Sequence, residues 1–194
     1  MILGFAHITK NVPVELLPVP DAGIPNPSEK WPLMARQAMA HRLGLESGLY
    51  GPTIELVEYD TGTVDQAGRL GLLTDAVALR VRSLGAEASF FCDGLGFRWG
   101  KGGRLHLDSA VDYWKVSILP WVEVDAPIDP PLDIAGYAAL AFYSSDVEAD
   151  RDHLLKHGGR TPTEPFTVKL DREMKIVMLR SPEGTIIELI QVLA

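Results

Sequence analysis

The chain has 194 residues, a formal net charge of -8 and an ordinary hydrophobic share of 46%. This length allows one substantial domain, or a domain with an appendage, and a real hydrophobic core. The negative charge, without any cluster of Lys or Arg, excludes a typical nucleic-acid surface, and no stretch approaches the roughly 20 apolar residues of a membrane span. Cys92 is the only cysteine, which leaves no intrachain disulfide. We therefore expect a cytoplasmic protein that binds neither nucleic acid nor membrane.

The N-terminal region, residues 1–74, predicts an incomplete structural unit followed by a connector. Its apolar start at residues 2–9 is typical of a strand. After a Pro-rich loop, residues 29–43 predict a helix. The β-branched run at residues 51–57 then predicts a closing strand. This region thus predicts a strand-helix-strand half-unit.

Two complete units follow the half-unit. Residues 75–124 and 136–194 each predict a strand, a helix and three further strands, and Pro-rich residues 125–135 form the linker between them. The predicted helices are 84–93 in the middle unit and 146–157 in the last unit. Glycines and turn residues separate the strands that follow each helix. Both units therefore have the order βαβββ.

One phrase occurs twice, at residues 51–57 and 184–190, and places Glu55 and Glu188 within β-branched runs. Side chains alternate between the two faces of a strand, so each glutamate shares a face with apolar neighbours two positions away. A carboxylate on such a face must be solvated, paired or bound to a cation, because burying a bare charge is costly. The alternative is a glutamate on an edge strand that faces water.

The two βαβββ units resemble the vicinal-oxygen-chelate superfamily, which includes glyoxalase I, bleomycin-resistance proteins and extradiol dioxygenases. The most specific pieces are Leu95-Gly-Phe97 after the middle helix and the segment 182–189 on the last strand. The resemblance covers most of residues 75–194. It implies an α+β fold in which paired βαβββ units form curled mixed sheets around a cupped cavity. It also implies metal ligands at a first-strand histidine and a last-strand glutamate of each unit.

The complete units depart from this ligand pattern. Their first-strand histidine positions fall on Ala76 and Ala139, and the last-strand glutamate of the middle unit falls near Ser117. A methyl group cannot ligate a metal, so the resemblance implies that a cavity between the middle and last units lacks the complete metal site.

The half-unit retains a matching pair, His7 and Glu55. Together with Glu188 these residues would bind one divalent ion, Fe, Mn, Ni or Zn, if the half-unit packs against the last unit or against a second chain. The alternative is that His7 is a hydrogen-bonded strand histidine and Glu55 a solvated or ion-paired residue.

Aromatic side chains offer a second kind of site. On the concave face of a curled sheet they could stack a planar or apolar ligand, although ordinary core packing is the alternative. His106 is the best acid-base candidate of the middle unit, because the ordinary pKa of histidine lies near neutrality. The candidate ligand-binding residues are Trp99, His106, Trp114, Tyr137, Tyr143 and Glu188.

Two functions compete at this point, and a structural or regulatory subunit is a third alternative. In the first, the protein binds a small organic molecule in the cavity between βαβββ units and uses no cofactor. In the second, it is a divalent-metal-dependent lyase, isomerase or dioxygenase that uses His7, Glu55 and Glu188. We expect a homodimer in either case. The distance between these three side chains decides whether the second function is feasible.

Overall fold

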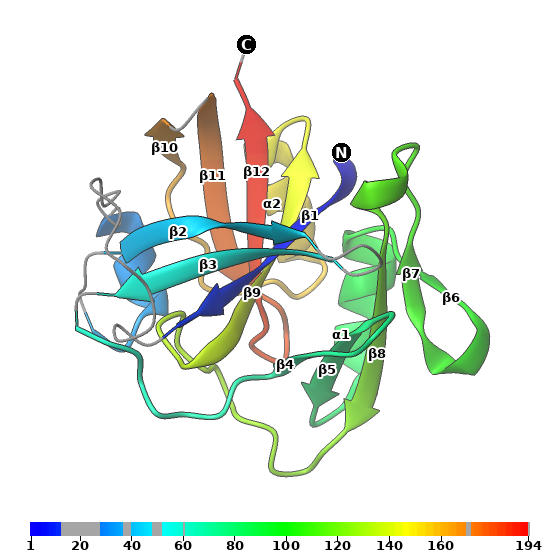
Figure 1. Ribbon diagram of the computed structural model, residues 1–194. Helices are drawn as coiled ribbons and strands as arrows, with labels where there is room; N and C mark the ends of the chain where they lie inside the picture. Colours follow the sequence, from blue (N-terminus) through cyan, green and yellow to red (C-terminus); the bar gives the residue numbers. More distant parts are fainter. Residues whose placement is uncertain (13–27, 37–39, 48–51, 60, 170–171, 194) are drawn as a thin grey trace.

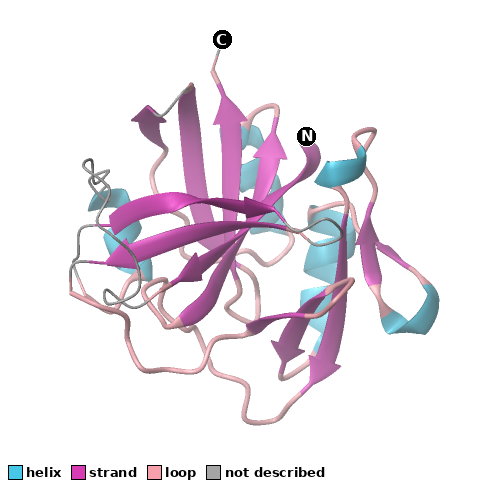
Figure 2. Cartoon of the chain, viewed as in Figure 1, coloured by secondary structure: helices cyan, strands magenta, loops and turns pink. Residues whose placement is uncertain are grey.

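The computed structural model describes residues 1–12, 28–36, 40–47, 52–59, 61–169 and 172–193. Two curled mixed sheets dominate the molecule, and the helices are few and short (Figures 1 and 2). This architecture confirms the expected α+β fold. Within the described residues, no helix has both the length and the apolar character of a membrane span. In chain order the elements are β1 (Ile2–Asn11), η2 (Ser28–Leu33), β2 (Ala40–Ser47), β3 (Thr53–Tyr59), β4 (Leu70–Leu72), β5 (Val77–Val81), α1 (Leu84–Ser89), η3 (Phe90–Gly94), β6 (Arg98–Trp99), η4 (Lys101–Gly103), β7 (Leu105–Leu107), η5 (Asp112–Trp114), β8 (Val116–Val122), β9 (Gly136–Ser144), α2 (Val147–Lys156), β10 (Phe166–Lys169), β11 (Glu173–Arg180) and β12 (Ile186–Val192).

The larger sheet joins the two ends of the chain. Its seven strands have the order β10-β11-β12-β9-β1-β3-β2, so the half-unit and the last unit lie side by side (Figure 1). In the half-unit β1 is parallel to β3, and in the last unit β9 is parallel to β12. The half-unit meets the last unit where β1 runs antiparallel to β9. Ile8 faces Leu140 at the centre of that meeting. The half-unit therefore completes the sheet of the last unit.

The middle unit forms a separate five-stranded sheet. Its order is β4-β5-β8-β7-β6, in which β5 and β8 are parallel. The short strand β4, which the sequence did not predict, pairs with β5 and occupies that edge. The middle unit therefore does not pair strand to strand with the last unit. The two units contact each other through side chains instead.

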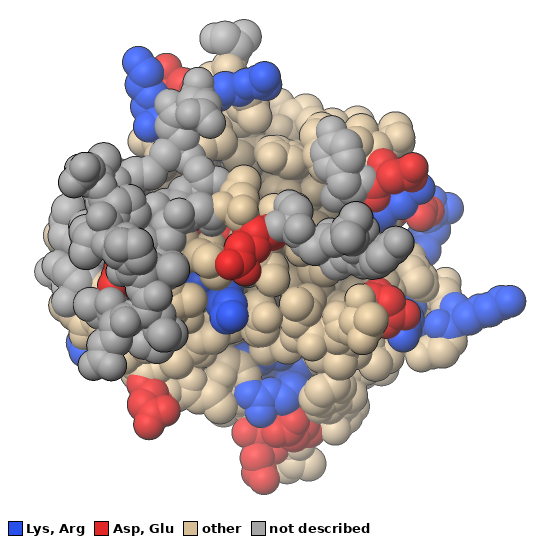
Figure 3. Space-filling model, viewed as in Figure 1, with Lys and Arg blue, Asp and Glu red and all other residues tan. Residues whose placement is uncertain are grey.

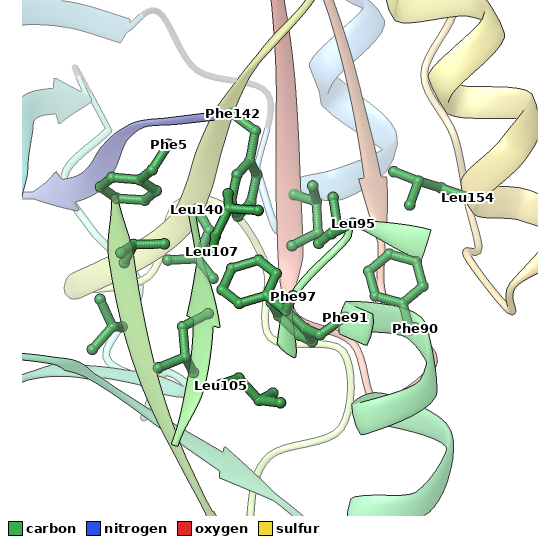
Figure 4. Close-up of a cluster of buried hydrophobic side chains, with 14 of the residues drawn as sticks. Phe5, Phe90, Phe91, Leu95, Phe97, Leu105, Leu107, Leu140, Phe142 and Leu154 are labelled. Carbon is green, nitrogen blue, oxygen red and sulfur yellow. The ribbon is translucent and has the colours of Figure 1, made fainter. Parts of the chain in front are cut away.

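A continuous hydrophobic core fills the space between the two sheets and the helices (Figure 4). Alternate residues of β5 and β9 point into it, as the two-residue period of a strand requires. The ring of Phe97 lies edge-on to Phe91 and Phe142, with centroid distances of 5.3 and 6.0 Å. Edge-to-face pairs of this kind add stabilisation beyond the buried area. The core thus fixes the middle unit against one face of the seven-stranded sheet.

The opposite face of the seven-stranded sheet, here called the inner face, bears Ala139, Ala141 and Glu188. At one end a second apolar cluster covers this face, in which Leu33 of η2 packs with Ile186 and Ala139. The short helix η2 therefore closes one end of the inner face.

Charged side chains of both signs are mixed on the surface seen in Figure 3.

The predicted helix at 29–43 is wrong. Of the described residues in this range, those up to Leu33 belong to the 3₁₀ helix η2 and those from Ala40 onwards to strand β2. Pro32 lies inside η2, and proline lacks the N–H and the space that an α-helix interior requires. Pairing of β2 with β3 then gives residues 40–47 backbone partners that a local pattern does not reveal. By contrast, the predicted helix at 146–157 is confirmed as α2, and Asp146 caps it by accepting a hydrogen bond from the Ala149 N–H.

Candidate metal centre

Strand register brings three predicted ligands to one place on the inner face. His7 of β1 lies opposite Ala141 of β9, and Ala141 lies beside Glu188 of β12. On the other side of β1, Glu55 of β3 lies beside Thr9. Residues 7 and 188 come from distant parts of the chain. Their approach depends on the pairing between the half-unit and the last unit.

The three side chains are close enough to share one ion. His7 Nε2 lies 3.1 Å from Glu55 Oε2 and 3.6 Å from Glu188 Oε2. One ligand atom of each residue lies within 4.8 Å of the others, and no second group of this kind occurs among the described residues. His7 and Glu188 are 8% and 4% exposed, so the cluster is largely shielded from water.

The two carboxylates control the charge of the histidine. Burial by itself lowers the pKa of the His7 imidazole, because it disfavours the charged form. The charges of Glu55 and Glu188 outweigh burial and raise the pKa of His7 to about 9. Without a bound cation, a protonated His7 therefore balances part of the negative charge. A proton occupies the position that a metal ion would take.

The donor set fits a divalent transition metal. His7 Nε2 is buried and makes no well-formed hydrogen bond, although two carboxylate oxygens approach it. One imidazole and two carboxylates suit Fe, Mn, Ni or Zn, and three protein ligands leave coordination positions open. The residues present therefore fit the ion that the resemblance implies.

The fourth ligand position of the paired units is apolar. In the half-unit, Glu55 lies beside Thr9, and His7 comes two positions before Thr9 on β1. In the last unit, Glu188 lies beside Ala141, so the residue that corresponds to His7 is Ala139, two positions before Ala141 on β9. Ala139 is completely buried beneath the apolar cluster that contains Leu33. The placement of this alanine at the histidine position agrees with the sequence analysis.

The middle unit has no comparable ligand set. Its helix follows Ser83, as α2 follows Asp146, so Ala76 and Ala78 correspond to Ala139 and Ala141. The partner of Ala78 on β8 is Leu119. The glutamate position of this unit is therefore Leu119 and not Ser117. The difference arises because residues 112–114 form the 3₁₀ helix η5 and β8 begins only at Val116.

Two of the predicted aromatic residues come together at a pocket. The rings of Trp114 and Tyr143 lie 4.9 Å apart. They line a pocket of about 370 Å³ together with Leu3, Ser144, Ser145, Arg172, Ile190, Gln191 and Val192. Ile190 follows Glu188 on the same face of β12, at a distance of about 7 Å along the strand. Ile190 therefore lies between the pocket and the His7 cluster, and none of the three candidate ligands lines the pocket itself.

The remaining predicted ligand-binding residues lie elsewhere. Trp99 is 49% exposed at the edge strand β6, and His106 lies beside Ser117 on the five-stranded sheet. Tyr137 lies on β9 beneath the ammonium group of Lys10. The structure therefore does not bring Trp99 or His106 to the Trp114 pocket.

Lys30, which is not among the residues predicted from the sequence, also lies at this site. Its Nζ lies 4.0 Å from Glu188 Oε1 and 5.4 Å from the centre of the Phe166 ring. Because residues 29–43 were assigned to a helix, nothing in the local pattern connected this lysine with β12. Only the fold of η2 over the inner face reveals the contact.

One family model matches most of the two complete units. Residues 74–189 match the family model for the glyoxalase/bleomycin resistance protein/dioxygenase superfamily. The chain belongs to this superfamily. The matched region includes Glu188 but neither His7 nor Glu55, so the half-unit of this superfamily member supplies two of the three candidate ligands.

Three solved structures are among those that match parts or most of the chain. The match with a variant of glyoxalase I from Zea mays covers 97% of this chain and 67% of the glyoxalase chain, at 16% identity and a TM-score of 0.46. A putative dioxygenase from Bacillus subtilis covers 98% and 63%, at 13% identity and a TM-score of 0.42. TnmS3, an antibiotic binding protein from a Streptomyces species, covers 63% and 99%, at 18% identity and a TM-score of 0.40. No curated protein matches the chain.

Proposed function

We propose that this superfamily member is a divalent-metal-dependent lyase, isomerase or dioxygenase that acts on a small organic molecule. The observation that carries the proposal is the approach of His7, Glu55 and Glu188 within 4.8 Å on the inner face. When bound, a divalent ion supplies Lewis acidity that polarises the oxygen atoms of a substrate. Membership of the superfamily supports this reaction class without selecting one reaction.

The protein's own residues have distinct roles in this proposal. His7, Glu55 and Glu188 would hold the ion, and the burial of His7 and Glu188 would strengthen electrostatic interactions by excluding water. The pocket that Trp114 and Tyr143 line together would take the organic part of the substrate against their rings.

A second candidate function is metal-free binding of a small organic molecule. The pocket favours it, since Trp114 comes from the middle unit and Tyr143 from the last unit. This is the first of the two functions inferred from the sequence. The homodimer and the cytoplasmic location also stay predictions.

Metal titration distinguishes the two functions. We expect protein stripped with a chelator to bind about one equivalent of Mn, Fe, Ni or Zn, and Glu188→Gln to weaken the affinity at least about tenfold because it removes a charged ligand. The matched control is Glu46→Gln, which changes an exposed glutamate of β2 and leaves the affinity unchanged. Isothermal titration calorimetry and elemental analysis measure both quantities. Uptake below about a tenth of an equivalent would favour the metal-free function.

A further inference from the structure

Lys30 places a positive charge beside the candidate metal centre. Its Nζ lies 4.0 Å from Glu188 Oε1, and only 19% of its side chain is exposed. The ammonium group also lies over the ring of Phe166, at 5.4 Å from the centroid. An ammonium group with this little exposure is stabilised by an anion or an aromatic face beside it. The contact is not that of a freely solvated surface lysine.

The helix that carries Lys30 is firmly attached to the inner face. The N–H groups of Ala35 and Arg36 donate hydrogen bonds to the buried carboxylate of Asp133, at 2.7 and 3.2 Å. The carbonyl oxygen of Leu33 accepts hydrogen bonds from the Leu132 N–H and from the Arg180 guanidinium, at 2.7 and 3.3 Å. The backbone next to Lys30 is therefore held in place before any ligand binds, which reduces the entropic cost of a contact with it.

With a divalent ion bound, the ion-paired groups of the described residues around the site would carry a surplus of one positive charge. Glu55 and Glu188 together balance a divalent ion if His7 is neutral, as metal ligation requires. Asp133 is balanced by Arg36, whose Nε lies 3.9 Å from it. The only ion pair recorded for Lys30 in the described part of the chain is with Glu188. Glu188 turns Oε2 towards His7 and Oε1 towards Lys30, so the ammonium group stays beside the ion site and can hold a second anion there.

We propose that Lys30 determines substrate specificity and that the substrate is a small organic monoanion, such as a carboxylate with a neighbouring hydroxyl or carbonyl oxygen. This inference rests on the proposed metal-dependent function and names its substrate class. The anionic group of the substrate lies between the ion site and Lys30, and its organic part extends past Ile190 towards Trp114. A charge-assisted hydrogen bond from the lysine fixes the anionic end.

Two probes of equal size test the charge requirement. Glycolate carries one negative charge, and glycolamide is its neutral counterpart. Calorimetry with Mn-loaded protein measures the ratio of the two dissociation constants for the wild type, Lys30→Met and Lys30→Arg. Methionine keeps the apolar contact with Phe166 but removes the charge, and arginine keeps the charge. Lys156→Met, on the exposed part of α2, is the matched control.

We expect Lys30→Met to reduce the preference for glycolate about tenfold or more, because a hydrogen bond to a charged group is lost. Lys30→Arg should keep most of the preference, and Lys156→Met all of it. The affinity of Lys30→Met for Mn alone should equal or exceed that of the wild type, since no cation then competes for Glu188. This measurement of Mn affinity shows that the Lys30→Met variant is folded and that its metal ligands are intact.

The outcomes separate the two proposals. If wild-type protein binds no metal, both the proposed function and this inference are overturned. If wild type and Lys30→Met bind Mn and show the same preference for glycolate over glycolamide, only the role of Lys30 is overturned. In that case the lysine serves to neutralise Glu188 in the metal-free protein.

Discussion

His7 demonstrates how its surroundings set the state of a single side chain. A buried histidine without partners would be neutral, because burial lowers its pKa. Here Glu55 and Glu188 reverse that effect and raise the pKa to about 9. The same pair of carboxylates that favours a proton also favours a metal ion. Proton and metal therefore compete for Nε2 of His7.

This competition predicts the pH dependence of metal binding. At pH values below about 9, His7 must release its proton before it can ligate, so metal affinity should rise with pH and level off above the pKa. The expected rise is about tenfold for each pH unit, corresponding to one proton. Chelator-buffered Mn titrations between pH 6.5 and pH 9 measure it. His153→Ala, an exposed histidine of α2, should leave the slope unchanged, and a flat profile in the wild type would contradict the assignment of His7 as a ligand.

Among the elements, the junction between α1 and the turn before β12 depends on one buried carboxylate. Glu87 of α1 accepts hydrogen bonds from the hydroxyl groups of Ser181 and Thr185, at 2.7 and 2.9 Å, and from the N–H of Glu183 at 3.0 Å. Burial raises the pKa of Glu87, and these hydrogen bonds oppose the rise. The cost of burying the carboxylate is therefore offset by contacts that join the middle unit to the last unit.

Replacing this carboxylate should destabilise the fold. Glu87→Ala leaves several buried donors without an acceptor, and we expect a loss of about 2–4 kcal/mol in the free energy of unfolding. Glu164→Ala, on an exposed loop, should change it by less than about 0.5 kcal/mol. Urea denaturation followed by circular dichroism measures both. Equal midpoints for the two variants would show that the buried contacts contribute little.

The whole molecule is assembled from the first and last parts of the chain, with the middle unit between them in sequence. The half-unit contributes β1, β2 and β3 to the seven-stranded sheet, and β1 covers the edge of β9. Phe5 and Ile8 of β1 are almost completely buried in the main core. The sheet of the last unit therefore depends on a segment outside the region that matches the family model, 74–189.

Removal of the half-unit tests this dependence. A chain of residues 75–194 would expose the edge of β9 and the apolar surface that Phe5 and Ile8 cover. Exposed edges of this kind pair with other strands. We expect the shortened chain to unfold at a lower temperature than the full chain and to self-associate, as measured by differential scanning fluorimetry and light scattering. A monomer with the full chain's midpoint would show that the complete units suffice.

The sequence by itself determined the order of strands and helices in the two complete units. Alternating apolar residues, the Asp146 cap and the turn glycines act over a few neighbouring residues, so a local pattern reveals them. It also identified His7, Glu55 and Glu188 as candidates, through the repeated glutamate phrase and the family resemblance.

Only the tertiary structure decided which units pair and what lies beside the site. The contact between β1 and β9 joins residues 125 to 142 positions apart, and no local pattern encodes that choice between the last unit and a second chain. Non-local strand pairing replaces part of the predicted helix at 29–43 by β2 and places Leu119 at the glutamate position of the middle unit. Packing on the inner face brings Lys30 to Glu188. The physical reason is that register and burial, which bring ligands together, are properties of the assembled sheet.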